Sequence, residues 1–330
     1  MNEFALIRRY FARRPARRVD LGIGDDCALL RPMADAPPVS GRHEGLSPGP
    51  AGLAVSCDML VAGRHFFDDV APADLGWKAL AVNLSDLAAM GARPRAFLLA
   101  MALPAAEPAW LEDFAAGLFE IADRFDCELI GGDTTRGPLN LCLTVFGDCP
   151  IDGALRRDRA EPDDDLWVSG ELGAAALAVR ERLAGRPLPP AHPAWTRLQR
   201  PVPRIELGLS LRHLASAAID LSDGLIGDLG HLADRSRVGV DVEWARVPVA
   251  PLLGGLTENE RMALALSGGD DYELAFTAAP ANRSAIESLA GRLGLPLTRI
   301  GRVRSGEGVG LNGPKGQTID HAFRAFDHFA

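Results

Sequence analysis

Short segments that place aspartate beside glycine, serine, threonine or cysteine recur along this chain, most of them at the ends of hydrophobic stretches. Ser56-Cys57-Asp58 closes one apolar run, and Asp220-Leu221-Ser222-Asp223 closes another in the second half of the chain. Glycine and aspartate favour turns, so each segment marks a point where a strand or a helix meets a loop. The full set covers residues 24–26, 56–58, 83–86, 131–135, 220–224 and 267–271. The chain is therefore expected to alternate strands and helices whose ends carry carboxylates.

The stretches between these segments predict the regular elements. Residues 51–58 read as a buried strand, and residues 72–90 read as a long helix with Pro72 in its first turn and Gly91 as its stop. In the second half, an alanine-rich helix is expected over 174–184, and a strand over 217–222 leads into a helix that ends near Arg235. These patterns predict an α+β fold, built as an α/β sandwich.

Chain length and composition predict two domains. A chain of 330 residues exceeds the size that a single hydrophobic core usually supports. The polar stretch 148–164 contains two prolines and is the expected boundary, which gives an N-terminal domain over 1–149 and a C-terminal α/β domain over 150–330. Residues 34–52 are rich in proline and glycine without hydrophobic periodicity, so we expect a flexible loop there.

Charge and cysteine content exclude several classes of protein. The formal net charge is −9, a value that the nine aspartates of the recurrent segments account for. With a pI near 5.3 the chain offers no broad basic surface for nucleic acid, and no apolar run approaches the roughly 18 residues of a membrane span. Five cysteines without a C-x-x-C pair indicate a reducing, cytoplasmic setting and no zinc site.

The recurrent aspartates favour magnesium chemistry on phosphates. Carboxylates on short turns are the hard oxygen ligands that Mg²⁺ prefers. Asp86 is the most informative position, because it interrupts an otherwise apolar helix, where an unpartnered carboxylate is costly. The chain has no P-loop motif and no calcium-loop spacing. A metal-dependent phosphotransferase is the first hypothesis, and a non-catalytic metal-binding module, which would bind metal without ATP, is the alternative from another class.

Longer runs make the first hypothesis specific. The runs GIGDDCALL, WKALAVNLSDLAAMGARP, LIGGDTTRGP, AIDLSDGLIGDLGH, ALSGGDDYEL and FDHFA resemble those of thiamine-monophosphate kinase, in the same order and over nearly the whole chain. That family belongs to the superfamily of aminoimidazole-ribonucleotide synthetase and selenophosphate synthetase. The resemblance implies ATP-dependent phosphorylation of thiamine monophosphate to thiamine diphosphate. It also implies a homodimer whose N-terminal sheets pair to build the ATP and Mg²⁺ sites.

The resemblance also implies a role for each matching residue. Asp86, Asp133 and Asp223 would be central to catalysis. Several Mg²⁺ ions would be held by Asp26, Ser56, Cys57, Asp58, Asp86, Asp133, Asp220 and Asp223. Gly132, Asp133, Arg157 and Ser222 would contact ATP. His65, Asp270 and Phe326 would bind the thiamine moiety.

Three positions depart from the family pattern. Cys57 stands where threonine is common, and because sulfur is a poor ligand for Mg²⁺, only its backbone carbonyl could serve. Asp270 replaces a glutamate and has a shorter reach, while Phe326 replaces tyrosine or tryptophan and lacks their polar group. Another ATP-using synthetase of the same superfamily is the nearest alternative, although the chain lacks the flexible glycine-rich start expected of selenophosphate synthetase.

Overall fold

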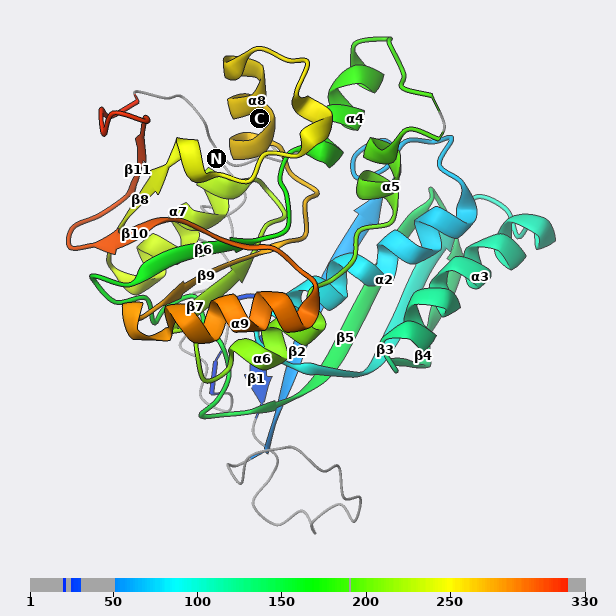
Figure 1. Ribbon diagram of the computed structural model, residues 1–330. Helices are drawn as coiled ribbons and strands as arrows, with labels where there is room; N and C mark the ends of the chain where they lie inside the picture. Colours follow the sequence, from blue (N-terminus) through cyan, green and yellow to red (C-terminus); the bar gives the residue numbers. More distant parts are fainter. Residues whose placement is uncertain (1–19, 22–24, 31–50, 190, 320–330) are drawn as a thin grey trace.

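The computed structural model describes residues 20–21, 25–30, 51–189 and 191–319. Its strands form two sheets, one of five strands and one of six (Figure 1). The five-stranded sheet has the order β1-β2-β5-β3-β4, and the six-stranded sheet the order β11-β8-β10-β6-β9-β7. Two mixed sheets with helices packed on them agree with the predicted α+β class.

The five-stranded sheet is built mainly from long antiparallel strands. Its members are β1 (Ala28–Leu30), β2 (Ala51–Val61), β3 (Arg93–Leu103), β4 (Glu128–Arg136) and β5 (Asn140–Pro150). Only β3 and β4 pair in parallel. Residues 51 and 52, which we expected in the flexible loop, begin β2, because their backbone pairs with Cys149 and Pro150 of β5. The rest of that expected loop lies outside the described residues.

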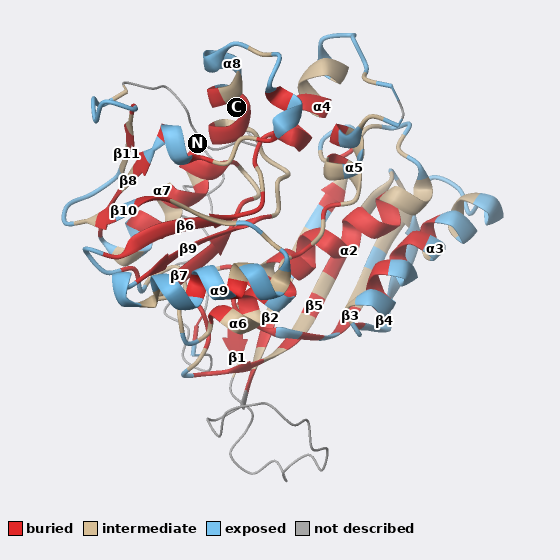
Figure 2. Ribbon diagram, in the orientation of Figure 1, coloured by how far each residue is buried: buried red, intermediate tan, exposed pale blue. Residues whose placement is uncertain are grey.

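Helices α2 (Pro72–Ala89) and α3 (Pro108–Arg124) cover one face of this sheet. On β5 the residues of that face, Leu141, Leu143 and Val145, are fully buried. The opposite face carries no helix among the described residues, and Met59 there is 53% exposed. The edge strand β4 is exposed along its whole length (Figure 2). One apolar face of the five-stranded sheet is thus uncovered in the single chain.

The six-stranded sheet is covered on both faces. Its strands are β6 (Asp165–Ser169), β7 (Ala217–Asp220), β8 (Gly239–Glu243), β9 (Leu274–Ala278), β10 (Leu297–Arg304) and β11 (Val309–Asn312). One core contains Leu166 and Val168 of β6 together with α7 (Leu225–Ser236) and α8 (Glu258–Ser267). Trp167, on the opposite side of β6, belongs to the core that includes α9 (Arg283–Leu293). This alternation is the period of two expected of strands buried on both faces.

The two halves share one hydrophobic core. Helix α6 (Ile205–Leu211) packs directly on α2, and a Cβ at Gly208 would come within 2.0 Å of the Ala88 carbonyl oxygen. Helix α5 (Pro193–Gln199) precedes α6, and the Trp77 indole of α2 donates a hydrogen bond of 2.7 Å to the Pro201 carbonyl between them. The helix α2 is therefore fixed by both halves.

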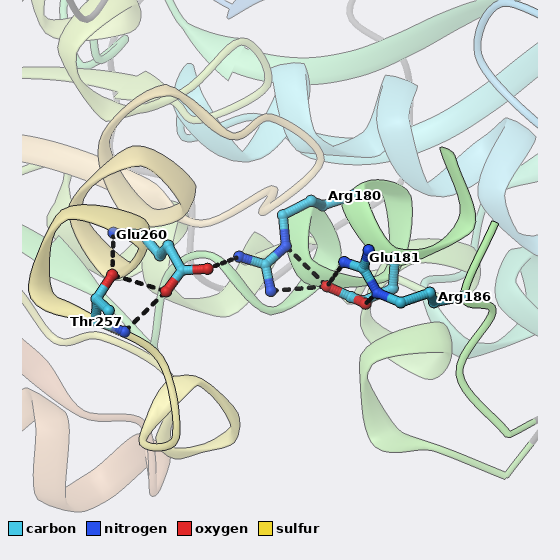
Figure 3. A network of polar contacts seen from close by, with 5 residues as sticks. All are labelled: Arg180, Glu181, Arg186, Thr257 and Glu260. Atoms are coloured by element: carbon cyan, nitrogen blue, oxygen red, sulfur yellow. Dashed lines mark hydrogen bonds and ion pairs between the residues drawn. The ribbon is translucent and has the colours of Figure 1, made fainter. Parts of the chain in front are cut away.

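Helix α4 (Ala174–Leu183) is joined to α8 at the surface. Thr257 and Glu260 form a capping box at the start of α8, and Arg180 of α4 extends it through an ion pair of 3.3 Å with Glu260 (Figure 3). Glu181 in turn binds both Arg180 and Arg186. Exposed pairs of this kind contribute little to stability, so the network mainly orients the two helix ends.

Asp165, at the start of β6, supplies a prediction about stability. Its carboxylate accepts hydrogen bonds from Arg283 at 2.5 and 2.7 Å and from Arg299 at 3.1 Å. Burial alone would raise the pKa of Asp165, but these bonds outweigh it and the pKa lies below its usual value. We expect Asp165→Asn to lower the free energy of unfolding by about 1–2 kcal/mol at pH 7.

The effect should depend on pH with a definite sign. A lowered pKa in the folded state stabilises the fold above the unfolded pKa, and this stabilisation is lost as the pH falls through the folded pKa. In urea titrations, the difference between wild type and Asp165→Asn should therefore shrink below about pH 4. Asp152→Asn, at an exposed aspartate, is the control and should match wild type. A difference that persists unchanged at pH 3 would contradict the role of this ion pair.

Candidate active site

Three aspartates from distant parts of the chain meet where α2 approaches the six-stranded sheet. Asp26 lies in the turn before β1, Asp86 in the last turns of α2, and Asp220 at the end of β7. Each offers a carboxylate oxygen, and these three oxygens lie within 4.8 Å of one another. We refer to Asp26, Asp86 and Asp220 as the tri-aspartate site.

Hydroxyl groups hold two of these carboxylates in place. The Ser56 hydroxyl, on β2, donates a hydrogen bond of 2.5 Å to Asp86 Oδ2. The Ser85 hydroxyl, on α2, donates one of 2.7 Å to Asp220 Oδ2 and so links the two halves of the chain. Both serines fix carboxylate oxygens without neutralising their charge.

The amide of Asn83 holds the backbone of Asp58, which carries a fourth carboxylate. Its Oδ1 accepts a hydrogen bond of 3.0 Å from the Asp58 backbone N–H, and its own amide nitrogen donates to the Ala79 carbonyl within α2. Asn83 is fully buried. The end of β2 is thereby tied to α2, which places the charge of Asp58 close enough to affect Asp86.

The electrostatics of the tri-aspartate site favour a bound cation. Burial, followed by repulsion from Asp58, Asp220 and Asp26, raises the pKa of Asp86 well above its usual value. Burial and repulsion from Asp26 likewise raise the pKa of Asp220. Asp26 Oδ2 is buried and accepts no hydrogen bond from the described residues. A hard divalent cation would neutralise this repulsion and occupy that oxygen, so the residues fit Mg²⁺.

Arg157 supplies the one guanidinium seen bound to this site among the described residues. It forms ion pairs with Asp26 and Asp25, and its side chain is only 12% exposed. Burial alone would lower the pKa of Arg157, but the two carboxylates outweigh it and the pKa lies above its usual value. Burial, then repulsion from Asp26, raises the pKa of Asp25 to about 7 although Arg157 opposes this. The arginine therefore stays charged beside the acidic cluster.

The segment 267–273 closes the site from the side of the six-stranded sheet. The Asp270 N–H donates a hydrogen bond of 2.9 Å to the Ser222 carbonyl, and a Cβ at Gly269 would lie 2.4 Å from the same oxygen. Only glycine allows this approach. Asp270 and Tyr272 adopt positive φ angles of 66° and 48°, a conformation that costs about 1–3 kcal/mol for such residues. The surrounding structure must therefore hold this turn.

A buried carboxylate anchors the same segment. Glu273 is fully buried, and its Oε2 accepts hydrogen bonds of 2.6 Å from both Arg204 and Ser169. A second bond from Arg204 makes the pair bidentate. The Asp270 carboxylate lies 2.5 Å from the Lys78 ammonium of α2. The turn is thus tied to both halves of the chain.

The structure brings together most of the residues expected to bind metal. Asp58 lies close enough to the tri-aspartate site to raise the pKa of Asp86. Asp223, three residues after Asp220, donates a hydrogen bond of 3.2 Å from its N–H to the buried Asp228. The Cys57 side chain is exposed and lies 3.4 Å from the Cys142 sulfur, because alternation along β2 turns it to the face opposite Ser56 and Asp58. Within one chain, the Cys57 thiol therefore points away from the tri-aspartate site, and metal binding at Cys57 stays a prediction.

Gly132 and Asp133 lie apart from the others. They belong to β4, at the far edge of the five-stranded sheet, and Asp133 is exposed. Strands β5 and β3 separate β4 from β2, which puts the two strands about 14 Å apart across the sheet. Within one chain, Asp133 does not join the tri-aspartate site.

The other expected contacts have mixed outcomes. Ser222 lies in the turn after β7, where its carbonyl holds Asp270. His65 lies in the turn after β2, where its Nδ1 accepts a hydrogen bond of 3.0 Å from the Val61 N–H. Phe326 falls outside the described residues. Their binding of ATP or thiamine stays a prediction.

Sequence reasoning missed Lys78, Ser85 and the pair of Arg204 with Glu273. Ser85 appeared only as part of the Asn-Leu-Ser-Asp motif, although its spacing of seven residues from Lys78 puts both on one face of the helix. A lysine within a helix of otherwise apolar character was the available signal. No spacing in the sequence pointed to Arg204 as the partner of Glu273.

Comparisons with known proteins agree with this geometry. The pattern of the AIR synthase related protein, N-terminal domain, matches residues 24–149, and that of its C-terminal domain matches residues 161–313. Thiamine-monophosphate kinase of Salmonella typhimurium is 46% identical over 335 residues, covering 99% of this chain and 98% of that protein. The enzyme of the same name from Bacillus subtilis is 34% identical and covers 92% of each chain.

Solved structures give the same result. The crystal structure of thiamine-monophosphate kinase from Stenotrophomonas maltophilia matches with a TM-score of 0.78 at 47% identity, covering 96% of this chain and 98% of that one. AaThiL complexed with AMPPCP and TMP matches with a TM-score of 0.81 at 28% identity, covering 99% of this chain and 97% of that one. The chain therefore belongs to the thiamine-monophosphate kinase family, within the AIR synthase related proteins.

Proposed function

We propose that the tri-aspartate site transfers the γ-phosphoryl group of ATP to thiamine monophosphate and so forms thiamine diphosphate. The observation that carries this assignment is the convergence of Asp26, Asp86 and Asp220 in a chain 46% identical to thiamine-monophosphate kinases. A structure of the related AaThiL bears an ATP analogue and TMP together, which agrees with direct transfer between the two substrates.

The reaction needs charge compensation more than a base. The acceptor oxygen of a phosphate monoester is largely ionised at neutral pH, so no side chain has to remove a proton from it. Two polyanions must instead approach in line, and their mutual repulsion is the obstacle. Mg²⁺ bound by the aspartates would neutralise phosphate charge. Arg157 would add a fixed positive charge beside Asp26.

The proposed magnesium ligands are the residues that geometry and sequence both favour. The tri-aspartate site would hold the first ion, and Asp58 and Asp223 would share further ions. The Ser56 hydroxyl and the Cys57 backbone carbonyl complete the set of oxygen donors. Ser222 and Arg157 would contact ATP, and Asp270, His65 and Phe326 would contact the thiamine moiety.

We further propose that the active unit is a homodimer. The uncovered face of the five-stranded sheet carries Met59 and Cys57, and the exposed β4 carries Ile130, which is 58% exposed. Apolar faces of this kind are typical of interfaces between subunits. Pairing of the two sheets would bring Asp133 and Gly132 of one subunit to the tri-aspartate site of the other.

The remaining assignments follow the sequence. We place the domain boundary at residues 149 and 150, at the last residue of β5 and before the segment that leads to β6. No helix in the described part of the chain is long and apolar enough to cross a membrane. We propose a cytoplasmic location, in keeping with the free cysteines of the described residues.

A direct assay tests the function. The purified protein is incubated with ATP, MgCl₂ and thiamine monophosphate, and the thiamine species are separated by chromatography. We expect thiamine diphosphate in this mixture, and none when free thiamine replaces the monophosphate or when EDTA is added. Absence of the diphosphate, from protein shown to be folded and dimeric, would contradict the assignment and direct attention to other phosphorylated acceptors.

A further inference from the structure

Lys78 is a buried lysine that the proposed reaction has not yet used. It is one of two lysines in the chain and lies on α2, where its side chain is only 4% exposed. Its ammonium is 2.5 Å from Asp270 Oδ1, on the segment that closes the site. Burial of an ammonium is costly unless it is paired. Here the partner is Asp270, so the ion pair joins the two halves of the chain.

The pair lies on the side of α2 that builds the active site. Lys78 and Ser85 are seven residues, or two helical turns, apart and therefore share one face of the helix, about 10 Å from each other along its axis. The Ser85 hydroxyl binds Asp220 of the tri-aspartate site. Asp270 is held to Ser222, between Asp220 and Asp223. The ion pair is thus held by α2 and by the turn after β7, which both carry residues of the tri-aspartate site.

The two members of the pair differ in access. The Asp270 side chain is 29% exposed, whereas that of Lys78 is almost fully covered. The backbone of Asp270 is held at a positive φ of 66°, and its N–H donates a hydrogen bond to the Ser222 carbonyl. Arg157 is already engaged by Asp26 and Asp25. Among the described residues, Lys78 is therefore the positive group best placed to bind the phosphate of the acceptor substrate.

We infer that Lys78 binds the phosphate of thiamine monophosphate and that the substrate takes the place of the ion pair. The inference rests on the proposed function. Thiamine monophosphate is a zwitterion with a positive thiazolium ring and a negative phosphate. On binding, the thiazolium ring faces Asp270 and the phosphate faces Lys78. Lys78 and Asp270 are therefore each paired with an opposite charge both in the free protein and in the complex. In the free protein, Lys78 and Asp270 thus pair with each other in place of the two opposite charges of the substrate.

This arrangement has a consequence for substrate choice. Free thiamine carries the thiazolium charge without the phosphate, so it would take Asp270 from Lys78 and leave the ammonium unpaired. The site should therefore prefer the monophosphate over free thiamine at the binding step. Lys78 becomes a specificity-determining residue that touches the substrate.

Binding measurements on the full-length dimer test this inference. Calorimetry with Mg²⁺ and without ATP gives the Kd of thiamine monophosphate and of free thiamine for each variant. Loss of a hydrogen bond to a charged group typically weakens binding about 10- to 100-fold. We expect Lys78→Met to weaken binding of the monophosphate by this factor and to tighten binding of free thiamine, because thiamine then leaves no ammonium unpaired. Asp270→Asn should weaken both ligands, and Lys315→Met, at the other lysine, should change neither.

The outcomes separate this inference from its alternatives. Equal weakening of both ligands by Lys78→Met would show that Lys78 acts only by positioning Asp270, and unchanged binding of the monophosphate would also overturn the inference. If Lys78→Met does not fold, the double variant Lys78→Met, Asp270→Asn removes both buried charges. That variant should lose the preference for the monophosphate, and retention of the preference would overturn the inference. Failure of wild type to form thiamine diphosphate would instead contradict the proposed function.

Discussion

Replacing Asp86 by asparagine should lower kcat by about 10³-fold and yet raise the melting temperature of the magnesium-free protein. Asparagine keeps the shape of the side chain and can still accept the hydrogen bond from Ser56. It removes one of three negative charges whose oxygens lie within 4.8 Å. Without metal, that charge only repels its neighbours, so its loss should raise the melting temperature by roughly 2–4 °C. With metal, the same charge is a ligand, so its loss should reduce catalysis.

The measurements are steady-state kinetics at saturating MgCl₂ and melting curves with and without Mg²⁺. Wild type should gain more thermal stability from Mg²⁺ than Asp86→Asn does, because binding to the folded state stabilises it. Asp234→Asn, at an exposed aspartate of α7, serves as the matched control and should behave as wild type. A kcat near that of wild type in Asp86→Asn, with the same gain from Mg²⁺, would remove Asp86 from the metal site.

Mixing two inactive variants should restore activity if the site is shared between subunits. Asp86→Asn damages the tri-aspartate site, and Asp133→Asn damages the contribution of β4, so each homodimer should be inactive. In a heterodimer, one site combines an intact tri-aspartate site with an intact Asp133, while the other site carries both defects. Random reassortment makes half of the dimers mixed, so about a quarter of wild-type activity is expected.

A second mixture provides the control. Asp86→Asn and Asp220→Asn lie in the same tri-aspartate site, so every site of their heterodimer carries one defect and no activity should return. Both mixtures are refolded together from denaturant, and dimers are checked by size-exclusion chromatography. Recovery in neither mixture, with heterodimers present and both homodimers inactive, would show that Asp133 does not complete the site of the other subunit. Equal recovery in both would contradict assembly of the site from two subunits.

Elements with strong local signals were predictable from the sequence. Pro72 and Gly91 bounded α2 to within one residue, because the helix start and stop depend on local backbone chemistry. Helices α5 and α6 were not expected, since each has only seven residues and depends on contacts with α2 from the other half. The strand β4 continues to Arg136 although it contains Gly131 and Gly132, because its pairing with β3 outweighs the weak strand propensity of glycine.

In the candidate site too, features that depend on neighbouring residues were predictable, and contacts between distant residues were not. Aspartates at element ends were visible in the sequence, and three of them do converge. The groups that hold them were not visible, because Ser85 and Asp220 are separated by 135 positions. Their contact depends on how α2 meets the six-stranded sheet. The pairing of Lys78 was not visible either, because a helix pattern does not show which distant carboxylate will bind an ammonium.

The course of α2 limits how relatives of this chain can vary in length. Lys78, Asn83, Ser85 and Asp86 all project from one rigid helix, and each has a different partner elsewhere in the chain. A single inserted residue between Lys78 and Asp86 would rotate one end of the helix by about 100° against the other and misplace at least one partner. Gene-length variation within the family should therefore accumulate in connecting segments and spare this stretch, and a one-residue deletion here should abolish activity even where the helix itself survives.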